Sequence, residues 1–204
     1  MPTQWVLCGG GAYSPHLRAQ LTERLNVFDS AQNVAANAES LGMVVSTGVG
    51  GGIVLDGRML DGASGNAGHI GHVIVNPDGN RCVCGARGCL EAEASGTAIE
   101  MITGRPATEP SFETMQRTGR MVGLAVASMC NFFDLNLAVV GGSVALGFGP
   151  TFFAAAQEVM DEHCRLSFSR GARIVPARLG DRSPIIGAAA VGWRGLNRQM
   201  PVES

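Results

Sequence analysis

A close cluster of cysteines and a histidine is the feature that most limits how this chain can fold. Cys82, Cys84 and Cys89 lie within eight residues, and His72 lies ten residues before the first of them. Three sulfurs and one imidazole nitrogen are the donors of a closed tetrahedral zinc site. Two glycines inside the cluster let the backbone bend enough for the sulfurs to converge. We therefore predict structural zinc, to which the alternative is a chance grouping of cysteines.

A glycine-rich segment before this cluster is a candidate phosphate-binding loop. Residues 46–52 read Ser-Thr-Gly-Val-Gly-Gly-Gly between two apolar segments. The backbone amides of such a loop, with the hydroxyl of Thr47, can hold a phosphate. Taken alone, the segment fits a glycine-rich hairpin without a ligand equally well, because glycine loops are weak evidence.

A second glycine pair, Gly141-Gly142, follows the apolar segment Leu137–Val140. A turn without side chains there could let the adenosine of a nucleotide pass close to the backbone. Taken alone, the pair favours an ordinary tight turn between a strand and a helix.

His69, His72 and Glu91 are polar residues in a glycine-rich, apolar stretch around the cysteines. Imidazoles and a carboxylate can hydrogen-bond the hydroxyls of a polyol, so these residues are candidate ligands of a sugar. The alternative for Glu91 is a carboxylate at a helix start, where it interacts with the helix dipole.

Alternating apolar strands and helical segments predict an α/β fold. We expect strands at 4–8, 43–46, 53–55, 73–75, 135–140 and 173–177. We expect helices at 15–25, 31–38, 95–102, 112–133, 150–165 and 184–196. Ser95 is the expected N-cap of the third helix, and residues 48–52 and Asp56-Gly57 are expected turns.

The composition excludes several classes of protein. A net charge of −2 and a pI of about 6.1 argue against binding to nucleic acid or to an anionic membrane. No apolar run approaches a transmembrane length, and no signal peptide is recognisable. We therefore expect a cytoplasmic protein, and in a reducing compartment clustered cysteines favour metal binding over disulfides.

These motifs together resemble the ROK family, named for repressors, open reading frames and kinases. The family includes bacterial glucokinases and N-acetylhexosamine kinases, and the resemblance is strongest to N-acetylmannosamine kinases and glucokinase-like members. The family pattern is a Gly-Thr-Gly-type loop, Gly-Glu-x-Gly-His and Cys-x-Cys-Gly-x-x-Gly-Cys-x-Glu, which residues 46–52, 68–72 and 82–91 match here. The resemblance covers roughly residues 30–196 and implies an actin-like ATPase (ribonuclease H-like) fold.

This resemblance also implies roles for particular residues. The implied zinc ligands are His72, Cys82, Cys84 and Cys89. The implied sugar contacts are His69, His72 and Glu91. The implied neighbours of Mg²⁺-ATP are Thr47, Gly48, Gly141 and Gly142. Residues 30–204 would be the C-terminal lobe with a zinc loop at 66–92, and relatives imply a homodimer.

Most family members carry a glutamate where this chain has His69. Bacterial N-acetylmannosamine kinases are similar to this chain here, with Gly-His-Ile-Gly-His at residues 68–72. An imidazole can donate or accept a hydrogen bond, which favours N-acetylmannosamine or another hexosamine over glucose.

The family's first phosphate loop and its catalytic aspartate have no evident counterpart. Glu39 and its neighbours match the end of the pattern Asn-Asp-Ala-Asn-x-Ala-Ala-x-x-Glu, but Ser30-Ala31 stands where Asn-Asp is expected. Alanine cannot accept a proton, so Asp29 is the only nearby candidate for the general base. We expect residues 1–29 to form an atypical strand, glycine loop and helix, with the family's N-terminal lobe largely absent.

The sequence thus predicts ATP-dependent phosphorylation of a hexose or N-acetylhexosamine, in a chain that is inactive if no base replaces the aspartate. The alternatives are a non-catalytic, sugar-binding regulatory protein and a truncated relic that folds around zinc. DNA repression is disfavoured because the chain has no basic recognition helix.

Overall fold

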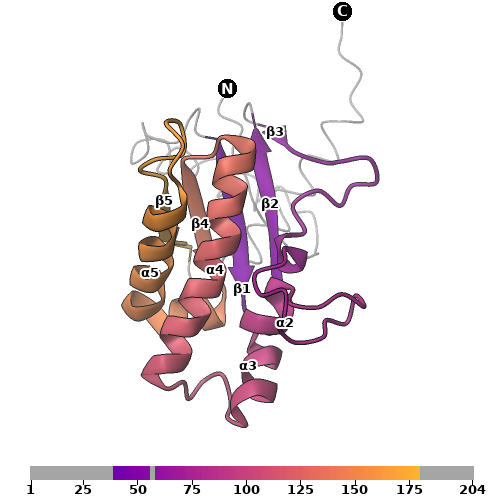
Figure 1. Cartoon of the computed structure of the whole chain (residues 1–204), viewed down its shortest axis with the longest axis vertical. Helices are drawn as coiled ribbons and strands as arrows, with labels where there is room; N and C mark the ends of the chain where they lie inside the picture. The colour runs from indigo at the N-terminus through magenta and orange to yellow at the C-terminus, as the bar shows by residue number, and fades with distance from the viewer. Residues whose placement is uncertain (1–38, 56–57, 180–204) are drawn as a thin grey trace, which may run out of the picture.

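The computed structural model describes residues 39–55 and 58–179, which form a mixed sheet covered by helices (Figure 1). The sheet order is β3-β2-β1-β4-β5. The strands are β1 (Ser40–Val45), β2 (Val49–Leu55), β3 (Arg58–Met59), β4 (Leu137–Gly141) and β5 (Arg173–Pro176). β1 pairs antiparallel with β2 and parallel with β4, and β5 continues the parallel half. The expected α/β class is confirmed.

The helices are η1 (Ile70–His72), α2 (Leu90–Ala94), α3 (Gly96–Thr103), α4 (Phe112–Phe133) and α5 (Ser143–His163). α4 and α5 lie side by side over one face of the sheet (Figure 1). The Oγ of Ser95 accepts a hydrogen bond from the amide of Ala98 and caps α3, as expected. Ser111 caps α4 in the same way, and the bounds of α4 equal the predicted range.

The core lies between the sheet and these two helices. Leu41 and Val140 from the central strands are fully buried, as are Val122 and Val126 of α4 and Phe152 of α5. Burying each side chain of this size contributes roughly 1.5–3 kcal/mol to folding. The apolar stripe predicted along 112–133 therefore packs the core.

Two glycines in α4 let its backbone pack directly against the backbone of α5. A Cβ atom at Gly119 would lie 2.4 Å from the carbonyl oxygen of Phe152, and one at Gly123 would lie 2.5 Å from that of Ala156. Both distances are shorter than real atoms allow, so larger side chains would push the helices apart.

The glycines after residue 49 do not form the predicted turn. Gly50, Gly51 and Gly52 lie within β2 and pair with β1, and the turn is confined to residues 46–48. A Cβ atom at Gly51 would lie 2.9 Å from the Cγ2 of Ile70. The missing side chains thus make room for the segment that carries the histidine pair.

One further expectation along the chain was wrong, and two helical segments were not predicted. Residues 73–75 form only one isolated bridge, between Ile74 and Cys89, because the surrounding chain follows the cysteine loop. The helix expected to begin at Pro150 is present, because the non-helical Gly149, with φ of 55°, separates it from a preceding helical segment. That preceding segment, which begins at Ser143, was not predicted. The short helix α2 was not predicted, since five residues are too few to show a helical period.

The expected elements at 4–8, 15–25, 31–38 and 184–196, the Asp56-Gly57 turn and Asp29 lie outside the described residues. Within the described residues, no helix has both the length and the apolar character needed to cross a bilayer.

We expect Gly123→Ala to destabilise the fold by about 1–3 kcal/mol, because its methyl group would overpack the contact with Ala156. The matched control is Gly147→Ala in α5, where a Cβ atom meets nothing within 4 Å. Replacing that helical glycine should stabilise the protein by up to about 1 kcal/mol. Urea unfolding of both variants measures the difference, and equal free energies would contradict the close helix contact.

Candidate metal and ligand site

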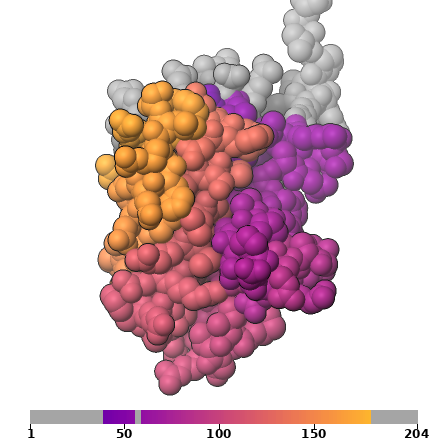
Figure 2. Space-filling view, viewed as in Figure 1, coloured from indigo at the N-terminus to yellow at the C-terminus, as the bar shows by residue number. Residues whose placement is uncertain are grey.

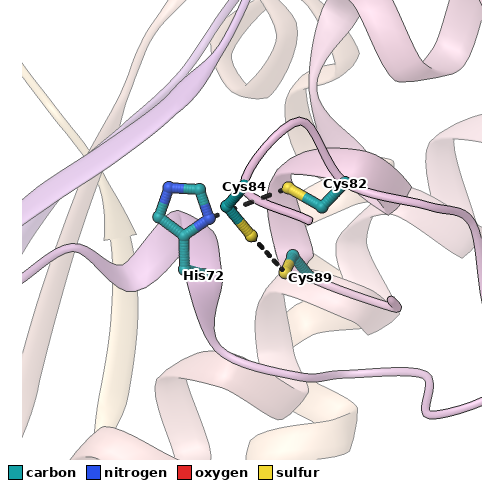
Figure 3. A group of neighbouring side chains, drawn as sticks. All are labelled: His72, Cys82, Cys84 and Cys89. Carbon is teal, nitrogen blue, oxygen red and sulfur yellow. Dashed lines mark hydrogen bonds between the residues drawn. The ribbon is translucent and has the colours of Figure 1, made fainter. Parts of the chain in front are cut away.

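Four side chains from three neighbouring segments converge on one point (Figure 3). His72 ends η1, Cys82 and Cys84 lie in the loop that follows, and Cys89 is the N-cap residue of α2. Their possible ligand atoms all lie within 4.8 Å of one another. The Nδ1 of His72 is 3.7 Å from the Sγ of Cys82, and the Sγ atoms of Cys84 and Cys89 are also 3.7 Å apart.

These spacings fit a tetrahedral ion. Zinc–sulfur bonds of about 2.3 Å place two sulfurs about 3.8 Å apart at tetrahedral angles, and a nitrogen slightly closer. Two of the six separations between ligand atoms, both 3.7 Å, are close to these values, and the others do not exceed 4.8 Å. The four predicted ligands are therefore brought together in an arrangement that could hold zinc through Nδ1 and three sulfurs.

The backbone between the cysteines is a tight, hydrogen-bonded loop. The amide of Cys82 donates to the carbonyl of Ala86, and the amide of Gly85 donates back to the carbonyl of Cys82. Gly85 and Gly88 have φ of 93° and 73°, which glycine adopts readily. A Cβ atom at Gly88 would also lie 1.6 Å from the carbonyl oxygen of Asn76, so this position excludes any side chain. In the space-filling view, this segment stands at the edge of the body formed by the helices (Figure 2).

The thiols of the cluster have different acidities in the metal-free protein. A hydrogen bond with the backbone of Ala86, and a further one with Cys82, lower the pKa of exposed Cys84. Burial, followed by hydrogen bonds with the neighbouring thiols, raises the pKa of Cys89 to about 12. The outer thiol is thus the more reactive one.

The predicted sugar ligands lie next to the metal cluster. The rings of His69 and His72 stack with centroids 5.6 Å apart and planes 11° apart. Glu91 lies in the first turn of α2, where its Oε2 accepts a hydrogen bond from the amide of Val49 at 3.3 Å. This position agrees with both interpretations of Glu91, as a ligand and as a carboxylate at a helix start.

The two predicted nucleotide segments are also neighbours. The Oγ of Ser46, in the β1–β2 turn, lies 2.8 Å from the Oγ of Ser143, the first residue of α5. Thr47 and Gly48 are exposed in that turn. Gly142 has φ of 98°, and a Cβ atom there would lie 2.2 Å from the carbonyl oxygen of Val45. Glycine is therefore needed for β4 to pass this close to β1 and enter α5.

The start of α3 fixes the same turn. The amide of Gly96 donates to the carbonyl of Ser46 at 2.7 Å, and the amide of Thr97 donates to that of Thr47 at 3.2 Å. The turn therefore keeps its shape through contacts outside the hairpin itself.

Sequence reasoning missed a buried ion pair that lies behind residues 80–89, the segment that carries the three cysteines and is called the metal loop below. Glu93 in α2 is fully buried, and its carboxylate pairs with the guanidinium of Arg117 in α4. The two residues are 24 positions apart, and no local pattern links them. The available signal was a second glutamate, Glu93, between the two alanines of the segment Leu-Glu-Ala-Glu-Ala.

One hollow of about 430 Å³ opens between α3 and the start of α4. Arg105 and Arg117 line it, but none of the predicted metal, sugar or nucleotide residues does. We give more weight to the converging polar groups than to this hollow, because recognition of a polyol needs placed donors and acceptors.

Comparison with known proteins places this geometry in context. The model of the ROK family matches residues 20–193. N-acetylmannosamine kinase of Haemophilus influenzae (strain PittGG) is 34% identical over 164 residues, which cover 72% of this chain and 52% of that protein. The chain thus spans about half the length of this curated relative.

Two solved structures share the fold. The ROK hexokinase from Thermus thermophilus is 33% identical with a TM-score of 0.69, covering 82% of this chain and 60% of the other. A ROK family transcriptional regulator, a homolog of the E. coli MLC protein, is 28% identical with a TM-score of 0.66, covering 85% of this chain and 49% of the other.

In metal-free protein near neutral pH, we expect iodoacetamide to modify Cys84 about ten-fold faster than Cys89, because only Cys84 is exposed with a lowered pKa. Cys130 is the internal control, since burial raises its pKa to about 12 and it should react only after unfolding. Peptide mass spectrometry over time measures the order. Equal rates at Cys84 and Cys89 would contradict the loop geometry.

Proposed function

The chain belongs to the ROK family, and on that premise we propose that it is the zinc-bearing lobe of an ATP-dependent sugar kinase. The observation that carries this proposal is the position of Glu91. Its carboxylate lies beside Gly71, between the two histidines, since a Cβ atom there would be 3.3 Å from Oε2. The same oxygen accepts a hydrogen bond from the amide of Val49, where β2 leaves the β1–β2 turn. A sugar hydroxyl held by Glu91 would therefore be close to a phosphate held at that turn.

The ion that we propose for the four-ligand cluster is zinc. Its support is the donor set of three thiols and an imidazole, whose ligand atoms lie within 4.8 Å of one another, with two pairs 3.7 Å apart. Four protein ligands leave no open position for water or substrate, so the ion would stabilise the loop and take no part in the chemistry.

We assign the nucleotide to the two adjoining glycine segments. Thr47 and Gly48 would contact the phosphates of Mg²⁺-ATP, and Gly141-Gly142 would let the adenosine pass close to the backbone. The support is the contact between Ser46 and Ser143, which places the turn beside the first residue of α5. Helix starts attract anions, and phosphoryl transfer depends mainly on positioning and on neutralising charge.

His69, His72 and Glu91 are the proposed sugar ligands. Because Nδ1 of His72 faces Cys82, its other ring nitrogen is left to hydrogen-bond a hydroxyl. His69 is exposed and can donate or accept, which favours N-acetylmannosamine or another N-acetylhexosamine. Asp29 stays the candidate general base, and a homodimer in the cytoplasm stays a prediction.

A regulatory, sugar-binding function is the second candidate. Two observations favour it: the catalytic aspartate of the family has no evident counterpart here, and one relative of known structure is a transcriptional regulator. Both candidates need a sugar site, but only the kinase consumes ATP.

We expect Cys84→Ser to lower bound zinc well below one equivalent and to lower the melting temperature by about 5 °C or more, since a structural ion contributes folding energy. The matched control is Val83→Ser at the neighbouring position, whose side chain is 92% exposed. That control should keep both the metal and the melting temperature. Elemental analysis with thermal unfolding measures both quantities, and unchanged zinc in Cys84→Ser would refute the assignment.

For the kinase proposal, we expect ADP release that depends on sugar, fastest with N-acetylmannosamine among glucose, mannose and their N-acetyl amines. Glu91→Gln should lower kcat/KM for the sugar about ten-fold or more, because it weakens a hydrogen bond to a charged acceptor. A coupled ADP assay measures the rates, and zinc content shows that the variant keeps its fold. Calorimetric sugar binding without ADP release would favour the regulatory alternative, and absence of both would exclude both functions.

A further inference from the structure

Glu93 is a completely buried carboxylate, and both of its oxygens accept hydrogen bonds. Its Oε1 accepts from the amide of Asn80 at 2.5 Å and from the Nδ2 of the same residue at 3.1 Å. Its Oε2 pairs with Nη2 of Arg117, while Nη1 of Arg117 donates to the backbone carbonyl of Glu93 at 2.7 Å. One side chain thus joins α2, α4 and the metal loop.

Asn80 connects this network to the segment that carries the three cysteines. Asn80 lies two residues before Cys82, and its carbonyl accepts from the amide of Gly88, the residue before Cys89. Both ends of the segment that carries the three cysteines are therefore held at Asn80. Gly79 lies directly against the carboxylate, since a Cβ atom there would be 2.2 Å from Oε1 of Glu93.

The same helix carries the proposed sugar ligand. Glu91 and Glu93 are both in the five-residue α2, which begins right after Cys89. Arg117 holds this helix onto α4 through both of its bonds to Glu93. A shift of Glu93 would therefore move the metal loop and Glu91 together.

We propose that Glu93 and Arg117 are a positioning pair that sets the metal-ligand geometry of the cysteine loop before any ion binds, and that keeps Glu91 at the β1–β2 turn. The proposal rests on the proposed function for the roles of the cluster and of Glu91. Ordering a flexible loop costs conformational entropy. If the pair orders the loop during folding, metal binding no longer carries that entropic cost, and the affinity for the ion increases. Groups that orient metal ligands typically account for about 10–100-fold in metal affinity.

A merely structural role makes a different prediction. A buried ion pair can often be replaced by apolar side chains of similar volume without loss of stability. Leucines at positions 93 and 117 could pack α2 against α4, but they offer no acceptor for the two donors of Asn80. Metal affinity and stability of the metal-free fold should therefore separate in such a variant.

The test compares zinc affinity, measured by competition with a chromophoric chelator, in full-length wild-type and variant chains. We expect the double variant Glu93→Leu with Arg117→Leu to bind zinc about 10–100-fold more weakly, with little change in the metal-free melting temperature. Asn80→Asp is a second variant, at an exposed loop position, that places a carboxylate against Glu93 and should weaken zinc binding similarly. The control Glu158→Gln breaks the exposed pair with Arg120 between α4 and α5 and should leave the affinity unchanged.

Two results would overturn the inference, and they are distinguishable. Wild-type affinity in both Asn80→Asp and the double variant would refute the positioning role while leaving the proposed zinc site intact. A wild-type chain that binds no zinc would refute the zinc site and the inference with it. As a second readout, sugar KM should rise more than kcat falls in Asn80→Asp, because Glu91 is displaced and the nucleotide turn is not.

Discussion

Close backbone contact at a few glycines is the constraint on which the site depends. Gly51 in β2, Gly71 in η1 and Gly88 in the cysteine loop each lie where a Cβ atom would collide with neighbouring backbone. At Gly71, that atom would be 2.5 Å from the carbonyl oxygen of Val49. Without side chains at these positions, the histidine pair and the metal loop can lie directly on the β1–β2 hairpin. The glycines thus make one compact site out of segments that are otherwise separate.

The metal loop is held in two independent ways. On one side, four ligand atoms converge and could be joined by an ion. On the other side, Asn80 and Glu93 tie the loop to α2 and α4 through hydrogen bonds and a buried charge pair. Removing one member of a buried pair leaves the other charge uncompensated, so such a network strongly favours one arrangement. An ion bound at the four ligands and the protein network would therefore stabilise the same loop conformation.

Glu91 connects this loop with the rest of the site. It follows the last cysteine by two residues and accepts a hydrogen bond from the amide of Val49, where β2 leaves the β1–β2 turn. That turn is in turn held by the amides of α3 and by the contact between Ser46 and Ser143. A rigid frame of this kind suits a reaction in which positioning supplies most of the catalysis. The same fold also occurs in a ROK family transcriptional regulator, so the frame by itself does not require catalysis.

The sequence by itself determined the features that depend on near neighbours. The spacing of apolar residues along 112–133 and the serine at position 95 specify α4 and α3, because helical period and capping act within a few residues. The spacing of three cysteines and a histidine likewise predicted the four side chains that converge in the cluster. Only the tertiary structure decided that Gly50–Gly52 form a strand, that a further helical segment precedes Pro150 in α5, and that Glu93 meets Arg117. Those outcomes depend on which segments come into contact in the folded protein. Contacts between residues far apart in the sequence produce no periodic sequence pattern from which they could be predicted.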